Sequence, residues 1–401
     1  MTDRERFLQT MAFGRPDRVP YSFGGPRQAT LSAWRYQGLK PDVSLHREIG
    51  YDDWRGVPID MLPLPRFEEV TLEVHGDKRI WIDELGTTRL DQVNPVTPGF
   101  VTRTWVDFPV KTRADFRRMA ERYRPDAPGR FGSDWAGYVA ANKPPRAHVL
   151  RGTVYGPFWR VRDWVGFERL CTMFLDEPAF VEEMFEFVAD FTIATFEQPG
   201  VAELEMDFVI ISEDMAYKTA SMISPAMVRR FMAPHYRRIN DAFRKAGVKN
   251  IVVDSDGHVS ELIPIWIDVG FDGSWPTEIA AGNDPLAYRK RFGREIVHFG
   301  GIDKRELRFD FARVKQEVMS KVPELLELGG YVPMVDHGVP PDIPVRNLLY
   351  MAELIKALAE GRDVDRANLD RYHDILGPIQ QDWSMELAER IAMADVMDEG
   401  S

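Results

Sequence analysis

Short apolar runs that end in polar or glycine-rich residues recur along the chain. Longer segments with helical periodicity separate them, and one of these begins at Ser224, a capping residue, and ends at Gly247. This alternation of strand, short loop and helix predicts a parallel sheet wound by crossover connections. The apolar runs begin at Arg18, His148, Asp207, Asn250, Phe271, Glu295 and Gly330.

These seven runs favour an α/β fold, a (β/α)8 TIM barrel, with its eighth strand expected within residues 49–58. A doubly wound open sheet is the alternative, but no G-x-G-x-x-G follows the first run. Residues 67–108 instead alternate apolar and polar positions around two turn signals, which predicts an antiparallel β insertion. We expect one barrel domain over residues 1–376, with residues 377–401 as a C-terminal helix and tail.

Composition narrows the class of protein. The chain has 401 residues, 44% of them hydrophobic, and a formal net charge of -12. That charge disfavours nucleic acid and anionic membrane as partners, and no apolar run is long enough for a membrane span. Cys171 is the only cysteine, which excludes an internal disulfide and a multi-thiolate zinc site. A cytoplasmic enzyme is the expectation, and a homodimer stays open.

Titratable residues follow the apolar runs, and the run at Asn250 leads directly into Asp254, Asp256 and His258. In a barrel, the residues just past the carboxyl ends of the strands form the active-site face. Converging carboxylates are costly unless a cation or a proton sits among them. The pattern therefore predicts metal ligands or acid/base groups at one rim. The candidates are Glu213, Asp214, Asp254, Asp256, His258, Glu278, Asp303, Asp336 and His337.

Each candidate also has a purely structural interpretation. The sequence Asp254-Ser255-Asp256-Gly257 is compatible with an Asx turn that ends a strand. Glu213 and Asp214 are compatible with caps of the next helix. His258 is expected to begin the following helix and to face solvent. Asp254, which still belongs to the alternation of the strand, and His337, at a strand end, are harder to explain in this way.

Six segments together resemble the uroporphyrinogen decarboxylase superfamily, which includes haem-pathway decarboxylases and corrinoid-linked methyltransferases. The resemblance extends from the first helix to Ala359 and implies a distorted (β/α)8 barrel. No single segment is specific, but their order and spacing are. The segments are RERFLQTMAFGRPDRVP, VYGPFWRVRDWVGFERL, ISPAMVRRFMAPHYRRI, VVDSDGHVSELIPIWIDVGFDGSWPTE, VHFGGIDKREL and GGYVPMVDHGVPPDIPVRNLLYMAELI.

The decarboxylase branch of the superfamily implies one set of site residues. Its pyrrole-facing aspartate would correspond to Asp53, and its His-Gly-x-x-Pro histidine to His337. Only half of its arginine pair is present, as Arg27, and its tyrosine after the Gly-Pro-Trp segment is replaced by Asp163. Fewer positive groups and an added carboxylate weaken the case for a polyanionic porphyrinogen.

The methyltransferase branch implies another set. Its zinc-binding His-x-Cys-Gly segment is occupied here by Asp254-Ser255-Asp256-Gly257, and its later cysteine falls near His337. Glu213, Asp254, Asp256 and His337 are then the expected metal ligands. Carboxylate and imidazole ligands suit zinc acting on an oxygen, or another divalent cation. Such a metal would polarise a methoxy oxygen so that a corrinoid can take the methyl group.

The sequence therefore favours a methyltransferase, or demethylase, that moves a methyl group from a small O- or N-methylated substrate to a corrinoid on a separate protein. The alternative is a cofactor-free decarboxylase of a uroporphyrinogen-like or other carboxylate substrate, and a third interpretation is a catalytically inactive binding protein. A divalent metal, with zinc the first candidate, belongs to the favoured interpretation. The expected catalytic residues are Asp53, Glu213, Asp254 and His337, and the expected substrate-binding residues are Arg27, Tyr155, Asp214, Glu278 and Asp303.

Overall fold

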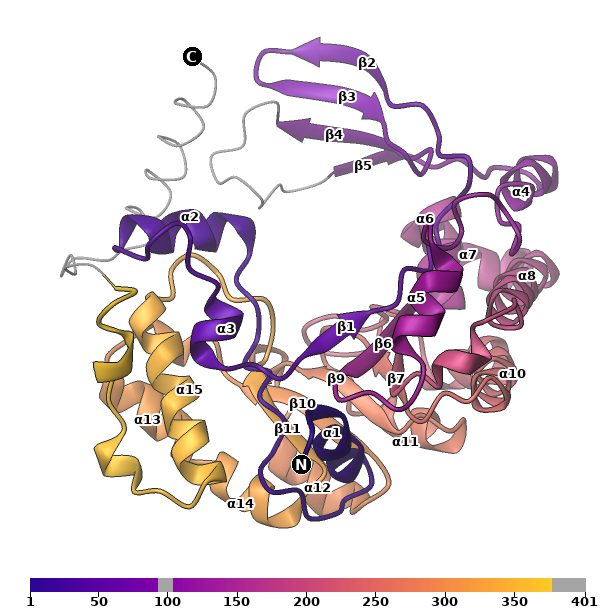
Figure 1. Ribbon diagram of the computed structural model, residues 1–401. Helices are drawn as coiled ribbons and strands as arrows, with labels where there is room; N and C mark the ends of the chain where they lie inside the picture. Colours follow the sequence, from indigo (N-terminus) through magenta and orange to yellow (C-terminus); the bar gives the residue numbers. More distant parts are fainter. Residues whose placement is uncertain (93–103, 377–401) are drawn as a thin grey trace.

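A curled parallel sheet forms the body of the molecule (Figure 1). The computed structural model describes residues 1–92 and 104–376. Its seven-stranded sheet has the order β1-β6-β7-β8-β9-β10-β11, with every neighbouring pair parallel. The six expected runs from His148 onward are strands, and the expected extra strand within residues 49–58 is β1. The bounds are β1 Trp54–Gly56, β6 Val149–Tyr155, β7 Phe208–Ser212, β8 Ile251–Asp254, β9 Gly273–Thr277, β10 Val297–Ile302 and β11 Tyr331–Val335.

The run from Arg18 is not a strand, and among the described residues no further strand closes the barrel between β11 and β1. An irregular segment occupies this gap. The Tyr21 carbonyl accepts a hydrogen bond from Asp52 N (2.9 Å), and the Phe23 carbonyl accepts one from Val335 N (3.2 Å). Pro20 and Pro26 cannot donate to a strand ladder, which explains the lack of regular pairing. The sequence predicted a closed barrel, and that prediction was wrong. The structure is a curled sheet whose two edge strands, β1 and β11, are joined through an irregular segment instead of an eighth strand.

Helices cover the outer face of the sheet (Figure 1). The helix expected from Ser224 is interrupted by a π-helical turn at Val228–Met232, next to Pro234, which has no N–H to continue the helical pattern. Ser224 does cap its start by accepting from Met227 N (3.2 Å). No described helix is long and apolar enough to cross a membrane. The α-helices are α1 Asp3–Met11, α2 Gln28–Tyr36, α3 Leu45–Ile49, α4 Arg113–Ala120, α5 Trp135–Asn142, α6 Pro157–Val165, α7 Phe167–Asp176, α8 Pro178–Phe196, α9 Pro225–Met227, α10 Ala233–Lys245, α11 Ile263–Asp268, α12 Pro285–Phe292, α13 Phe311–Met319, α14 Val322–Leu328 and α15 Val345–Ala359.

The predicted antiparallel insertion is present as a four-stranded sheet of order β2-β3-β4-β5. Its strands are β2 Val70–His75, β3 Lys78–Ile82, β4 Thr88–Gln92 and β5 Thr104–Asp107. Figure 1 shows this sheet at the top, on the side of the molecule where α2 and α6 lie. Residues 93–103 of the insertion, and the helix and tail predicted for residues 377–401, fall outside the described residues.

Aromatic side chains fill the interior of the curled sheet toward its amino end. Phe7 of α1 packs against Phe208 of β7 and Trp54 of β1, with ring centroids 4.8 and 5.3 Å apart. Phe299 of β10 belongs to the same buried cluster. Because this end is packed with apolar side chains, the polar residues that follow the strands are left to line the opposite, carboxyl end.

Candidate active site

Three aspartates meet where β7 and β8 end. Asp254 is the last residue of β8, and its Oδ2 accepts a hydrogen bond from the hydroxyl of Ser212 on β7 (3.0 Å). Asp214 lies beside it with a φ of 41°, and its Oδ1 accepts from the backbone N–H of Asp256 (3.1 Å). Burial, together with the charges of Asp214 and Asp256, raises the pKa of Asp254 to about 7. Asp254 can therefore hold a proton near neutral pH.

A histidine that follows β11, a strand that is not adjacent to β7 or β8, completes the cluster. His337, which follows β11, places its Nε2 2.8 Å from Asp256 Oδ2 and its Nδ1 3.1 Å from Arg27 Nη2. Arginine can only donate, so Nδ1 is the acceptor and the Nε2–H donates to Asp256. The Asp256 carboxylate raises the pKa of His337, while burial and the charges of Lys304 and Arg27 oppose that shift. The network fixes the tautomer of the imidazole and the direction of the Asp256 carboxylate.

These groups face a cavity of about 340 Å³ at the carboxyl end of the sheet. Trp159 and Trp275 supply apolar walls, together with Met334. A cavity of this size, with apolar walls and a few converging polar groups, is typical of a small-molecule site. The polar side chains that line it are Asp214, Asp254, Asp256 and His337.

The segment Asp254–Gly257 is both a turn and part of the site. Gly257 has a φ of +86°, and a Cβ there would lie 2.5 Å from the Ala216 carbonyl oxygen, so only glycine fits. Its N–H donates to Glu278 Oε2 (3.0 Å), and the other Glu278 oxygen pairs with Lys304 (3.2 Å). Glu278 thus anchors the turn that presents Asp256 to the cavity.

Glu213 has a different environment from the aspartates. It is fully buried, and its carboxyl accepts from Trp159 N (2.8 Å), Phe158 N (3.4 Å) and the hydroxyl of Tyr236 (2.5 Å). The two N–H groups belong to the first turn of α6, whose N-cap Gly156 has no side chain to satisfy them. Glu213 therefore serves as the cap of α6, and we assign it a positioning role. Burial raises its pKa to about 7.

The remaining predicted site residues lie apart from this cluster. Asp53 precedes β1, at the amino end of the parallel sheet, where its half-exposed carboxylate pairs with Arg55 (2.6 Å). Asp303 pairs with Arg305 (2.7 Å) in the loop after β10. Tyr155 lines a second, larger cavity. The structure thus brings Arg27 and His337 together, but it does not bring Asp53, the third residue of the decarboxylase resemblance, to them.

The four expected metal ligands do not form a metal site in the described part of the chain. No three histidine, cysteine, aspartate or glutamate side chains lie together there as ligands for one ion. Both ring nitrogens of His337 have protein partners, and the Glu213 carboxyl is used at the start of α6. As placed, Glu213, Asp254, Asp256 and His337 do not fit the predicted divalent metal, and no chemical step is derived through one.

Sequence reasoning missed several residues of this site. Ser212 ends β7, Trp275 lies within β9 and Trp159 lies in the first turn of α6, and none of them belongs to a titratable pattern. The signal available for Trp159 was its position just after a strand, in the Gly-Pro-Phe-Trp segment.

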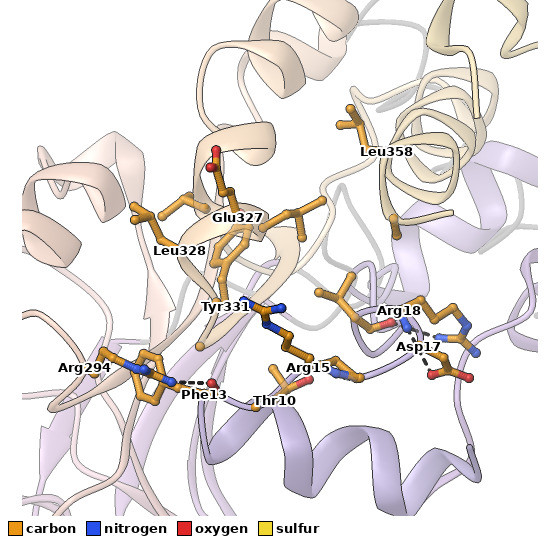
Figure 2. A pocket seen from close by; sticks show the side chains of 18 residues that line it. Thr10, Phe13, Arg15, Asp17, Arg18, Arg294, Glu327, Leu328, Tyr331 and Leu358 are labelled. Atoms are coloured by element: carbon orange, nitrogen blue, oxygen red, sulfur yellow. Dashed lines mark hydrogen bonds between the residues drawn. The ribbon is translucent and has the colours of Figure 1, made fainter. Parts of the chain in front are cut away.

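A further cavity, of about 360 Å³, lies near the amino ends of the strands (Figure 2). The cationic side chains of Arg18 and Arg294 are engaged there, with Asp52 (2.7 Å) and with the Phe13 carbonyl. In a parallel barrel this end supports stability, whereas catalysis occurs at the carboxyl end.

Comparison with known proteins places the chain in a family. Residues 106–358 match the model of the uroporphyrinogen decarboxylase (URO-D) family, and the chain belongs to this family. A solved methyltransferase from Methanosarcina mazei is similar over 90% of this chain and 99% of its own, with a TM-score of 0.59 and 15% identity, which supports the fold. A B12-independent methionine synthase from Shewanella sp. W3-18-1 is more remote (TM-score 0.37, 12% identity, 56% and 65% covered). No curated protein sequence matches the chain.

The raised pKa of Asp254 predicts a pH-dependent stability. Its pKa is about 7 in the folded protein and about 4 in an unfolded chain, so its contribution is fully present below about pH 4 and is lost as the pH rises through 7. We therefore expect Asp254→Asn to gain stability relative to the unchanged protein as the pH rises from 5 to 7, by at most about 1.4 kcal/mol per pH unit, and the difference to level off above pH 7. Urea unfolding across this range measures the difference. If the free energy of unfolding changes with pH in the same way in both proteins, the pKa of Asp254 is not raised by folding.

Proposed function

We propose that this chain is a methyltransferase that removes a methyl group from a small O- or N-methylated substrate. The observation that carries the proposal is Asp254, a carboxyl able to hold a proton near pH 7, in the wall of a small cavity at the carboxyl end of the sheet. A methylated oxygen or nitrogen is a poor leaving group unless it gains a proton or an equivalent charge. A positioned acid with a pKa near the working pH meets that need.

In the proposed reaction, the bond between the methyl carbon and the heteroatom breaks and its electron pair stays on the heteroatom. The heteroatom takes the proton of Asp254, which leaves a carboxylate. The electron pair of the new bond to the methyl group comes from the cobalt(I) of a corrinoid held by a separate protein. Solvent then returns a proton to Asp254.

Neighbouring residues prepare Asp254 for this role. Asp214 and Asp256 keep its proton in place by their negative charge, and the Ser212 hydroxyl fixes one of its oxygens. His337, held by Arg27, orients the Asp256 carboxylate. Trp159 and Trp275 hold the substrate and limit water in the cavity. The proposal needs no metal, since the proton supplies the charge that a Lewis acid would otherwise supply.

The proposal predicts the products of a reconstituted reaction. With a reduced corrinoid protein, small methoxy and methylamino compounds should yield demethylated product and a methylated corrinoid in equal amounts. Mass spectrometry and the visible spectrum of the corrinoid measure the two. Uroporphyrinogen should be rejected, because the acidic cavity repels a polyanion.

Two outcomes would contradict the proposal. One is the absence of methyl transfer across the set of compounds, with the protein folded by circular dichroism. The other is release of carbon dioxide from uroporphyrinogen at a useful rate, which would return the function to decarboxylation.

A further inference from the structure

A second cavity, of about 710 Å³, lies between the inserted antiparallel sheet and α6. It shares two wall residues, Trp159 and Asp214, with the smaller cavity of the aspartate cluster. The inserted sheet contributes Trp105 and Leu85, and the barrel contributes Tyr155 and Phe167. Because the walls are rich in aromatic side chains, the cavity suits a flat, apolar ring.

Arg160 is the unusual residue in this cavity. Its side chain is only 3% exposed, and it lies 4.4 Å above the ring of Tyr155. Its Nη1 makes one long hydrogen bond, to Asp163 Oδ2 (3.4 Å), and its buried Nη2 has no partner in the described part of the chain. A buried guanidinium is costly unless it is paired and hydrogen-bonded, and this one is incompletely satisfied.

The other charged residues around the cavity are already engaged. Arg162 donates to the Asp214 carbonyl (2.6 Å), Arg89 pairs with Asp83, and Glu84 pairs with Arg66 (3.3 Å).

Asp163 only partly satisfies Arg160, because its Oδ2 accepts one long hydrogen bond from Nη1 and none from Nη2. Burial also raises the pKa of the Asp163 carboxyl, although the charges of Arg160 and Arg162 oppose that shift. The guanidinium of Arg160 therefore still lacks acceptors for its N–H groups. A carboxylate has two acceptor oxygens and can bind arginine in the bidentate geometry that arginine favours.

We propose that this cavity binds an aromatic carboxylate, with its carboxylate on Arg160 and its ring between the aromatic walls. The inference rests on the proposed methyl transfer and names its substrate class. A methoxy group on such a ring would point toward Trp159 and Asp214, the two residues that this cavity shares with the smaller cavity where Asp254 lies. Arg160 is then a specificity-determining residue, whereas Asp254 acts on the leaving oxygen.

Binding can be tested without turnover. Isothermal titration calorimetry should show saturable binding of 3-methoxybenzoate to the purified full chain, and at least tenfold weaker binding of the neutral 3-methoxybenzamide. Arg160→Met should weaken benzoate-type binding at least tenfold, since it keeps much of the apolar volume and removes the fork of donors. The matched control is Arg117→Met, at an exposed position of α4, which should bind as the unchanged chain does.

The inference is overturned if the amide binds as tightly as the carboxylate, if no methoxybenzoate isomer binds saturably, or if a folded Arg160→Met variant binds within threefold of the unchanged chain. The comparison of acid with amide uses the unchanged protein, so it holds even if the variant fails to fold. Binding without demethylation would leave this site intact and contradict the proposed function. Demethylation of a neutral methoxyarene without any binding of the carboxylates would support the proposed function and contradict the carboxylate site.

Discussion

Replacing Asp254 by asparagine is expected to lower the rate of methyl transfer by about 10² to 10⁴, the usual contribution of a positioned general acid. Asparagine keeps the size of the side chain and its contact with the Ser212 hydroxyl, but it cannot give up a proton. Substrate binding should change little, so the loss should fall on kcat and leave KM nearly unchanged. Steady-state kinetics with a saturating reduced corrinoid protein measures both constants.

The pH profile separates an acid from a residue that only shapes the cavity. In the unchanged enzyme, kcat should fall as the pH rises above about 7, because Asp254 then loses its proton. In Asp254→Asn the remaining kcat should not decrease as the pH rises above 7. The matched control is Asp268→Asn, at the end of α11, whose exposed carboxylate pairs with Arg229 (2.7 Å). A variant at position 254 with more than a tenth of the normal rate, or with the same decrease of kcat above pH 7, would contradict the assignment.

The sequence predicted which residues gather at the rim, but it did not predict their hydrogen-bond partners. Asp254, Asp256 and His337 were expected at one rim because the carboxyl ends of parallel strands meet at the same edge. Their convergence follows from strand periodicity and the order of the runs, which are local properties. Arg27 reaches His337 from the N-cap of α2; the resemblance named both residues but did not predict their contact.

Non-local hydrogen bonds decided the remaining roles. Glu213 looks like a strand-end ligand in the sequence, yet its partners are the N–H groups at the start of α6 and Tyr236 of α10. Asp53 matched a family motif, but a motif does not say which end of the sheet a residue occupies. The run from Arg18 has the apolar composition of a strand, whereas its prolines prevent regular pairing.

Arg160 is a residue whose importance the sequence did not indicate. It is one of two basic residues in the sequence of α6, and nothing in its sequence neighbourhood marks it as buried. Its burial depends on the aromatic residues that surround it, Tyr155 and Tyr123 among them. A charged residue that the fold buries but does not satisfy is visible only in three dimensions.

Replacing Glu213 by alanine is expected to lower the free energy of unfolding by about 3 to 5 kcal/mol. The change leaves Trp159 N and Phe158 N without their acceptor and the Tyr236 hydroxyl with only the Met215 sulfur (3.8 Å). Each buried donor left unsatisfied costs about 1 to 3 kcal/mol. Glu213→Gln should be far milder. Its carbonyl can accept from Trp159 N while its amide donates to the Tyr236 oxygen. Chemical denaturation of the variants measures both losses.

A double-mutant cycle with Gly156 tests the geometry behind this prediction. A Cβ at position 156 would lie 2.1 Å from Glu213 Oε1, although the φ of -73° at Gly156 suits alanine. Gly156→Ala should therefore be strongly destabilising in the unchanged protein and much less so when Glu213 is already alanine. The coupling free energy should exceed about 1 kcal/mol, as is usual for residues in direct contact. Additive losses would mean that Glu213 does not cap α6, and would restore it as a candidate for the chemistry of the cavity.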